Sequence, residues 1–197
     1  MSFTSAALAY RESIVAAEMY QLTGDWNAVR NKVVAENLLQ MRTSNASKRI
    51  CREVVSRLKL LTPTELEIVV DGARQEQSYA LWLAVCKRYR FIYDFAVDVL
   101  REKYLRLSLE LTLDDYDAFF NAKAEWHPEV DRIPDTTRYK QRQFLYRMLR
   151  EAELLSKDGC ILPALLTPRL AEAIKEDDPA HFNIYPISDF DIREWYT

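Results

Sequence analysis

Residues 25–61 read DWNAVRNKVVAENLLQMRTSNASKRICREVVSRLKLL, and two helical patterns lie within this stretch. Asp25 is a favoured N-cap residue, and Val29 and Val33 follow it at roughly helical spacing. A polar turn at residues 42–45 separates this first helix from a second one, which is amphipathic and basic. Two helices joined by a short turn, with the second one basic, have the outline of a helix-turn-helix.

Helix signals continue on both sides of this stretch. We expect a helix from about Ser5 to Leu22 that ends at Gly24, because glycine readily adopts the left-handed conformation of a C-cap. The sequence TPTE at residues 62–65 combines an N-cap, a proline at the first helical position and a glutamate three residues after the cap. Further helices are expected over residues 73–107, 112–127 and 137–155 and after residue 167.

The fold class is therefore all-α, and we expect a compact bundle of about seven to eight helices. Near the C-terminus, Cys160–Leu162 and His181–Ile187 are expected as two short strands that pair in a small β-hairpin. Gly72 divides the chain into an N-terminal helical lobe, residues 1–72, which contains the basic segment, and a C-terminal helical lobe, residues 73–197.

The composition excludes several kinds of site. The 197 residues include three glycines and two histidines, too few for a phosphate-binding loop, a dinucleotide fingerprint or a His-rich metal site. Three cysteines without a CxxC spacing are typical of incidental thiols in a reducing compartment. The longest uncharged stretches have ten residues, whereas a membrane-spanning helix needs about 20 apolar ones. We expect a cytoplasmic, non-catalytic protein without a cofactor, a metal or a membrane contact.

The net charge of −3 is distributed unevenly along the chain. Residues 42–61 contain six basic residues and one acidic residue, and residues 136–150 contain five basic residues and no acidic one. Each of these two basic segments carries a formal charge of +5, and the rest of the chain is acidic. Because the local field governs contact with a polyanion, an acidic protein can still bind nucleic acid through such segments.

The first basic segment carries its cations mostly opposite an apolar face. Burial of Ile50 and Val54 outweighs like-charge repulsion, so packing should point the cations to solvent. Lys48 and Arg49 fall in the first turn of the expected helix, where the helix dipole disfavours cations, and this mismatch indicates an external anion. The alternative is a solvated face without a ligand. Lys59, near the C-terminal end, suits the dipole, which favours a structural role there.

The second basic segment again places cations, Arg138 and Lys140, in an early helical turn. They can bind phosphates, or they can pair with acidic neighbours such as Asp131, Asp135 and Glu151, and the sequence supports both interpretations equally. In a complex, the basic side chains of both segments would contact phosphates, and the polar residues of the turn would bond the backbone or base edges. The residues predicted to contact nucleic acid are Arg42, Ser44, Asn45, Lys48, Arg49, Arg52, Lys59, Arg138, Lys140 and Arg142.

Other conspicuous residues are expected to serve structure. Trp82 lies in the most apolar stretch of the chain, so we expect it in the core and not on a base-stacking surface. Asp114 and Asp115 suit the first turn of a helix. His127 and His181 lack partners at the spacing of a metal site or a catalytic triad.

Ten short groups of positions carry a family resemblance: Asp25-Trp26, ENLL at 36–39, Arg42-Thr43, Lys48-Arg49, Arg57-Leu58, Leu61-Thr62, LWLA at 81–84, Tyr89, Phe95 and LREK at 100–103. In this pattern the chain resembles BrxA, a component of the bacteriophage exclusion (BREX) defence system. The resemblance covers nearly the whole chain, and its positions are scattered along helices.

The resemblance implies an all-helical fold similar to that of the antitermination factor NusB. It also implies binding of double-stranded DNA within a multi-protein system that includes a DNA methyltransferase, and it implies no catalytic residue. A NusB-like fold leaves RNA open as the ligand. A third alternative is a protein–protein adaptor that docks its basic segments onto acidic surfaces of other BREX components.

Overall fold

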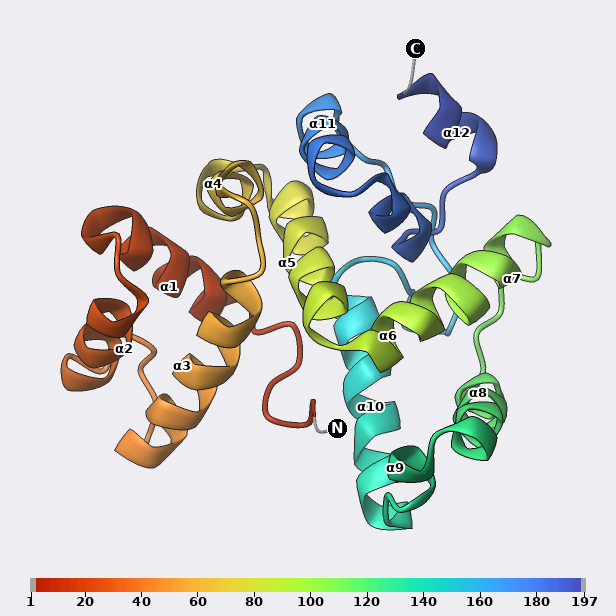
Figure 1. Ribbon diagram of the computed structural model, residues 1–197, viewed down its shortest axis with the longest axis horizontal. Coiled ribbons are helices and arrows are strands. Elements are labelled where there is room, and N and C mark those ends of the chain that lie inside the picture. Colours follow the sequence, from red (N-terminus) through yellow and green to blue (C-terminus); the bar gives the residue numbers. More distant parts are fainter. Residues whose placement is uncertain (1–2, 196–197) are drawn as a thin grey trace.

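The computed structural model describes residues 3–195, which form an all-α fold without a β-strand (Figure 1). The N-terminal helices are α1 (Tyr10–Thr23), α2 (Trp26–Ala35), α3 (Ser44–Leu58) and α4 (Pro63–Asp71). The remaining helices are α5 (Arg74–Arg88), α6 (Arg90–Phe95), α7 (Glu102–Leu105), α8 (Leu113–Trp126), α9 (Pro128–Asp131), α10 (Asp135–Glu151), α11 (Pro168–Asp177) and α12 (Asp189–Glu194). A π-helical segment (Ala96–Arg101) joins α6 to α7, and a 3₁₀ helix (Pro179–Ile184) follows α11.

The all-α class is confirmed, and the described residues hold more helices than expected because several are short. The stretch over residues 73–107 breaks at Tyr89, whose extended backbone ends α5 and begins α6. Two helices, α9 and α12, span only four and six residues.

Local capping residues fix several helix ends as expected. Gly24 adopts a φ of 65° at the C-terminus of α1, and the Asp25 carboxylate accepts two backbone N–H groups at the start of α2. Capping boxes at residues 62–65 and 112–115 begin α4 and α8. The second of these boxes confirms a structural role for Asp115.

The sequence predicts a first helix that begins at about Ser5, but the helix begins at Tyr10. Residues 3–9, which we call the N-terminal strap, form no helix, and Phe3 within them is fully buried. Ala9 ends the strap in the left-handed conformation, with a φ of 54°. Hydrogen bonds to Arg57 and Glu151 hold the strap, and they outweigh the helix propensity of its alanines.

The expected β-hairpin near the C-terminus is wrong. The segment from residue 179 to residue 184 is a 3₁₀ helix that begins at Pro179 and is capped by Asp178. Cys160 and Ile161 make isolated β-bridges instead, to Glu110 and Leu155. The cap and the proline favour a helical turn over an extended strand, and packing of the turn's apolar side chains stabilises it further.

Helix α5 runs through the centre of the fold (Figure 1). Trp82 on α5 is fully buried, and its indole N–H donates to the carbonyl of Ile184 at 3.1 Å. The hydroxyl of Tyr185 donates to the carbonyl of Tyr79 at 2.8 Å. These bonds tie the C-terminal segment to α5 and confirm that Trp82 is a core residue.

The hydrophobic core is continuous across residue 72. Helices α4 and α5 pack against each other, and Val69 on α4 belongs to the same buried cluster as Trp82 on α5. The expected lobes 1–72 and 73–197 therefore share their packing. Within residues 3–195, no helix is both long and apolar enough to cross a bilayer.

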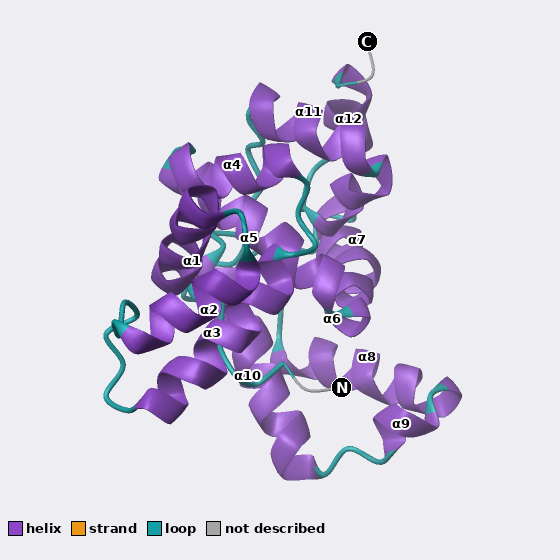
Figure 2. Ribbon diagram, turned by 60° about the vertical axis from the view of Figure 1, so that its left-hand side comes forward, coloured by secondary structure: helices purple, strands orange, loops and turns teal. Residues whose placement is uncertain are grey.

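Helix α3 lies far from the C-terminal helices α11 and α12. In Figure 1, α3 lies at the lower left, and α11 and α12 lie at the upper right. Figure 2, turned by 60°, again places α11 and α12 at the top and α3 and α10 in the lower part. The surface around α3 and the surface around α12 therefore belong to opposite ends of the fold.

Candidate nucleic-acid interface

Helix α3 begins earlier than its sequence pattern indicated. The Thr43 hydroxyl oxygen accepts the backbone N–H of Ala46 at 3.2 Å, and this cap starts the helix at Ser44. Lys48 and Arg49 consequently lie in the second turn of the helix, whereas the sequence pattern had placed them in the first turn. Because the helix dipole acts mainly within the first turn, the predicted dipole mismatch is wrong. Exposure and charge are the features of α3 that indicate a ligand.

Helix α3 has one buried and one exposed side. Ile50, Val54 and Leu58 are buried, as expected, and pack into the core. The other side and the preceding turn form an exposed surface that we call the α3 basic face, consisting of Arg42, Ser44, Asn45, Lys48, Arg49 and Arg52. Burial of the apolar side fixes the rotation of the helix, and thereby directs these cations to solvent.

Three cations of the α3 basic face are not neutralised. Within residues 3–195, the side chains of Arg42, Lys48 and Arg52 form no ion pair and no hydrogen bond. Unpaired cations on one exposed face produce a local positive potential even when the whole protein is acidic. Such a surface attracts phosphate groups.

Arg49 has a second role beside its exposed charge. Its Nη1 group donates a hydrogen bond to the Ser5 carbonyl at 3.3 Å, which ties α3 to the N-terminal strap. A phosphate bound by Arg49 would compete with this carbonyl or share the guanidinium with it, since the group has five N–H donors.

Arg57 carries a structural role that the sequence did not reveal. Its side chain is buried, and it donates to the Ala7 carbonyl at 2.6 Å, the Ala6 carbonyl at 3.0 Å and the Glu53 carboxylate at 2.8 Å. The Tyr89 hydroxyl donates to the same carboxylate. Burial, together with this bond, raises the pKa of Tyr89 to about 12. One cation of the first basic segment is therefore fixed in the core and holds the strap.

Lys59 is exposed, but it lies at the other end of α3. It follows Lys48 by eleven residues, which is about 16 Å along a helix. Backbone N–H groups of residues 27 and 28 lower the pKa of Asp25, and the charge of Lys59 adds a smaller effect in the same direction. The structure thus places Lys59 beside the start of α2 and apart from the α3 basic face.

The second basic segment forms most of α10, where two arginines share one acidic partner. Arg138 and Arg142 both bond the Asp117 carboxylate on α8, and Arg138 also donates to the Asp117 carbonyl at 3.2 Å. Pairing with the flanking acidic segments is therefore confirmed for these two arginines, although their partner is Asp117 and not Asp131 or Asp135. Since both guanidinium groups are only partly exposed, their contribution to the surface charge is reduced.

Lys140 and Arg150 are the cations of α10 that stay exposed and form no ion pair in the described part of the chain. Arg147 is also exposed, but it pairs with Glu151 at 2.7 Å. Of the three positions predicted on this helix, Lys140 alone is free to bind a phosphate without losing a partner among the described residues.

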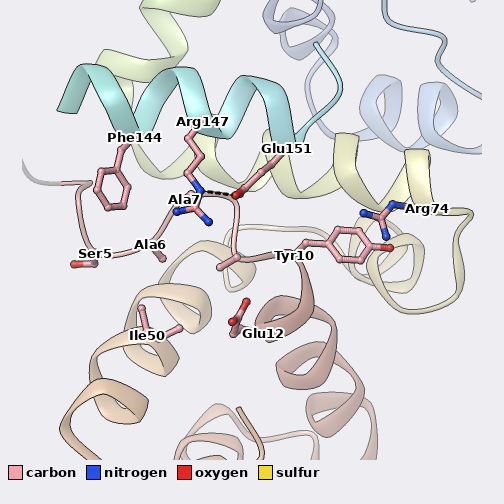
Figure 3. Close-up of a pocket in the computed structure, with 11 residues that line it drawn as sticks. Ser5, Ala6, Ala7, Tyr10, Glu12, Ile50, Arg74, Phe144, Arg147 and Glu151 are labelled. Carbon is pink, nitrogen blue, oxygen red and sulfur yellow. Dashed lines mark hydrogen bonds and ion pairs between the residues drawn. The ribbon is translucent and has the colours of Figure 1, made fainter. Parts of the chain in front are cut away.

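A cavity of about 480 Å³ separates α3 from α10 (Figure 3). Ile50 lines it from α3, Phe144 and Arg147 line it from α10, and the N-terminal strap crosses between them. The Leu8 backbone N–H donates to the Glu151 carboxylate at 2.8 Å. The strap is thus bonded to α3 through arginines and to α10 through a carboxylate, so it links the two basic helices.

The described residues offer no metal-binding constellation. They contain no group of three or more His, Cys, Asp or Glu residues that could hold a metal ion. Cys51 and Cys86 are buried, and burial raises the pKa of both thiols, whereas Cys160 is exposed. The Nδ1 atom of His181 lies 3.0 Å from an Asp177 carboxylate oxygen, and the two form an ion pair only when the imidazole is protonated.

Comparison with known protein families identifies relatives of this chain. A family model described as BrxA matches residues 1–178. The chain belongs to the BrxA family. This confirms the resemblance drawn from the sequence.

Two curated BrxA relatives carry the name BREX protein BrxA. The relative from Bacillus cereus (strain H3081.97) is 29% identical over 127 residues, which are 64% of this chain and 64% of that protein. The relative from Escherichia coli O9:H4 (strain HS) is 25% identical over 142 residues, 72% of this chain and 67% of that protein. The chain therefore spans about two thirds of the length of these curated BrxA proteins.

A solved structure shares the BrxA fold described above. It is an uncharacterized protein from Magnetospirillum magneticum, with a TM-score of 0.79 and 21% sequence identity, and the match covers 93% of this chain and 96% of that one. The likeness shows a common architecture over nearly the entire chain.

Two structural classes stand out among the positions that carry the BrxA resemblance. Arg57, Leu58 and the LWLA motif at residues 81–84 are buried, so they serve packing. Arg42 and Lys48 are exposed on the α3 basic face without a partner among the described residues, and Arg49 is exposed beside them while it bonds the Ser5 carbonyl. The second class is the one that a ligand could explain.

Proposed function

We propose that this chain is a non-catalytic, DNA-binding component of a BREX phage-defence system, and that the α3 basic face is its main DNA contact. The observation that carries the proposal is the row of exposed cations, Arg42, Lys48 and Arg52, which lie opposite a buried apolar side and are unpaired within residues 3–195. Membership of the BrxA family, whose curated relatives are named BREX proteins, supports the system in which this binding would act.

Phosphate contacts would supply most of the affinity. Four cations of the α3 basic face, with Arg49 included, would neutralise about four phosphates, which corresponds to a slope of about −3.6 in a plot of log K against log salt. If Lys140 and Arg150 on α10 also bind, six contacts would give about −5.4. Ser44 and Asn45 are exposed at the start of α3, where their side chains can donate hydrogen bonds to the sugar–phosphate backbone or to a base edge.

Duplex DNA is the preferred ligand because α3 is a regular helix of 15 residues with one free side. The major groove of B-DNA admits an α-helix, whereas the major groove of an RNA duplex is too narrow for side chains to enter. The RNA-binding alternative predicts that single-stranded or structured RNA competes better than duplex DNA. The adaptor alternative predicts no binding to either nucleic acid.

Fluorescence anisotropy with a labelled DNA duplex tests this proposal. Replacing Lys48 and Arg52 by Glu should weaken binding by roughly 60-fold or more at 0.1 M salt, since each lost phosphate contact removes about 0.9 from log K there. Neither side chain forms a hydrogen bond or ion pair with another described residue, so the variant should keep its fold. Arg193→Glu, an exposed position on α12 at the opposite end without an ion pair among the described residues, is the matched control and should leave binding nearly unchanged. Equal loss in both variants would contradict the proposed site.

A further inference from the structure

The N-terminal strap is anchored near both of its ends. Phe3 is fully buried, and its ring centroid lies 5.7 Å from that of Tyr89 and 6.2 Å from that of Phe91. Near the other end, the Leu8 backbone N–H donates to the Glu151 carboxylate on α10 at 2.8 Å. Figure 3 shows the strap between α3 and α10. The middle of the strap is therefore held between two fixed points.

The middle of the strap turns its carbonyl groups toward the arginines of α3. The Ala6 and Ala7 carbonyls accept hydrogen bonds from the buried Arg57. The Ser5 carbonyl accepts a hydrogen bond at 3.3 Å from Arg49, which is exposed on the α3 basic face. Because the strap is anchored on either side of Ser5, this carbonyl occupies a defined position beside the α3 basic face.

Arg49 differs in this respect from other cations of the α3 basic face. The side chains of Arg42, Lys48 and Arg52 have no partner within residues 3–195, so each loses its rotamer freedom when it binds a phosphate. Arg49 is already held by one hydrogen bond, and a guanidinium has five N–H donors, so donors remain for a ligand. A phosphate takes two of them in the parallel geometry of guanidinium–phosphate pairs. The strap bond and a phosphate contact can therefore exist together.

We propose that the strap is a positioning element of the DNA contact: the Ser5 carbonyl holds the Arg49 guanidinium ready for a phosphate, so an ordered strap and bound DNA stabilise each other. This inference rests on the proposed function, and it assigns a role to a backbone group that does not itself touch DNA. The Arg49 guanidinium is shared between the carbonyl and the phosphate, and DNA does not displace the strap.

The size of this coupling follows from side-chain entropy. Immobilising a flexible side chain on binding corresponds to about two- to tenfold in affinity, and the strap bond removes part of this cost for Arg49 in advance. Opening of the strap should therefore weaken duplex DNA binding by up to about tenfold without any change of charge. Because the coupling between two sites is reciprocal, bound DNA should stabilise the closed strap by the same factor.

The Phe3→Ala substitution tests the coupling, because it removes an anchor of the strap and leaves every cation in place. Anisotropy with a labelled DNA duplex should show binding about two- to tenfold weaker than that of the unchanged chain. In a chain that already carries Arg49→Ala, the same substitution should have no further effect, since the strap acts through this guanidinium. Phe3→Leu keeps an apolar side chain in the anchor and should give a smaller effect, which can be measured even if the alanine variant folds poorly.

Hydrogen exchange at the Leu8 amide provides a second measurement that needs no change within the strap. This amide exchanges when the strap leaves Glu151, so its rate reports strap opening. Saturating duplex DNA should slow the exchange about two- to tenfold in the unchanged chain, and should leave it unaltered in the Arg49→Ala chain. Faster exchange in the presence of DNA would show that a phosphate displaces the Ser5 carbonyl, and would overturn the proposal.

The Ile174→Ala substitution is the control for a general loss of stability. Ile174 is fully buried on α11, far from α3, so its truncation should leave the DNA affinity of the folded chain unchanged. Equal weakening by Phe3→Ala with and without the Arg49 side chain would contradict the role of the strap, while DNA binding by the unchanged chain would still stand. Absence of DNA binding in the unchanged chain would refute the proposed function itself, and this inference with it.

Discussion

The Arg57→Ala substitution tests whether the buried cation of α3 stabilises the fold, in contrast to the exposed cations that are proposed to bind a ligand. The guanidinium of Arg57 is buried, and it bonds two strap carbonyls and the carboxylate of Glu53, whose side chain is only 11% exposed. Removal would leave the Glu53 charge in the core without its cation. Breaking a buried ion pair by deleting one partner typically costs about 3–5 kcal/mol. This is a large part of the total stability of a domain of this size.

Urea unfolding followed by circular dichroism measures this loss. Arg57→Ala should move the unfolding midpoint strongly downward, and Arg57→Lys should recover part of the stability, because lysine keeps the charge but not the planar fork of donors. Arg52→Ala, five residues earlier on α3, is the matched control, since its exposed side chain has no described partner. It should unfold as the unchanged chain does and bind DNA more weakly.

The reverse pattern would refute this reasoning. If Arg57→Ala costs less than about 1 kcal/mol, the guanidinium is not a desolvated anchor of the strap. If Arg52→Ala destabilises the chain as much as Arg57→Ala does, exposure on the α3 basic face is not a guide to function.

Three further predictions address the core, α10 and the strap. Trp82→Ala should destabilise the protein by about 3–5 kcal/mol in the same unfolding assay, and a stable variant that loses DNA binding would instead place the indole in the interface. Asp117→Asn should free one unit of positive charge on Arg138 and Arg142, and if α10 contacts DNA the salt slope should steepen by about 0.9; an unchanged slope would place α10 outside the interface. Arg49→Ala should weaken DNA binding and also raise proteolytic cleavage within residues 3–9, because it removes a bond to Ser5; unchanged cleavage would show that the strap does not need this bond.

The sequence predicts those features whose causes are local. Gly24 and Asp25 mark a helix end and a helix start through conformations and bonds within three or four residues, so their signals can be read without the fold. The apolar spacing around Val54 likewise indicates which side of α3 is buried, and thus which side carries exposed cations.

The features that the sequence could not predict depend on distant parts of the chain. Arg57 resembles the other cations of its segment, and the strap carbonyls that bury it lie about 50 positions earlier in the chain. Asp117 on α8 bonds Arg138 and Arg142 on α10, which lie 21 and 25 positions later in the chain. The start of α3 is a different case, because Thr43 offers a local cap that would have shown Lys48 to lie in the second turn.

The salt dependence of binding to a short DNA duplex tests the central claim most directly. Anisotropy titrations of the full chain between about 50 and 200 mM salt should give a log–log slope between about −3.6 and −5.4, and Lys48→Glu with Arg52→Glu should reduce its magnitude by about 1.8. A chain that shows no binding at the lowest salt with tens of micromolar protein, or whose slope is the same in the double variant, would contradict DNA binding through the α3 basic face.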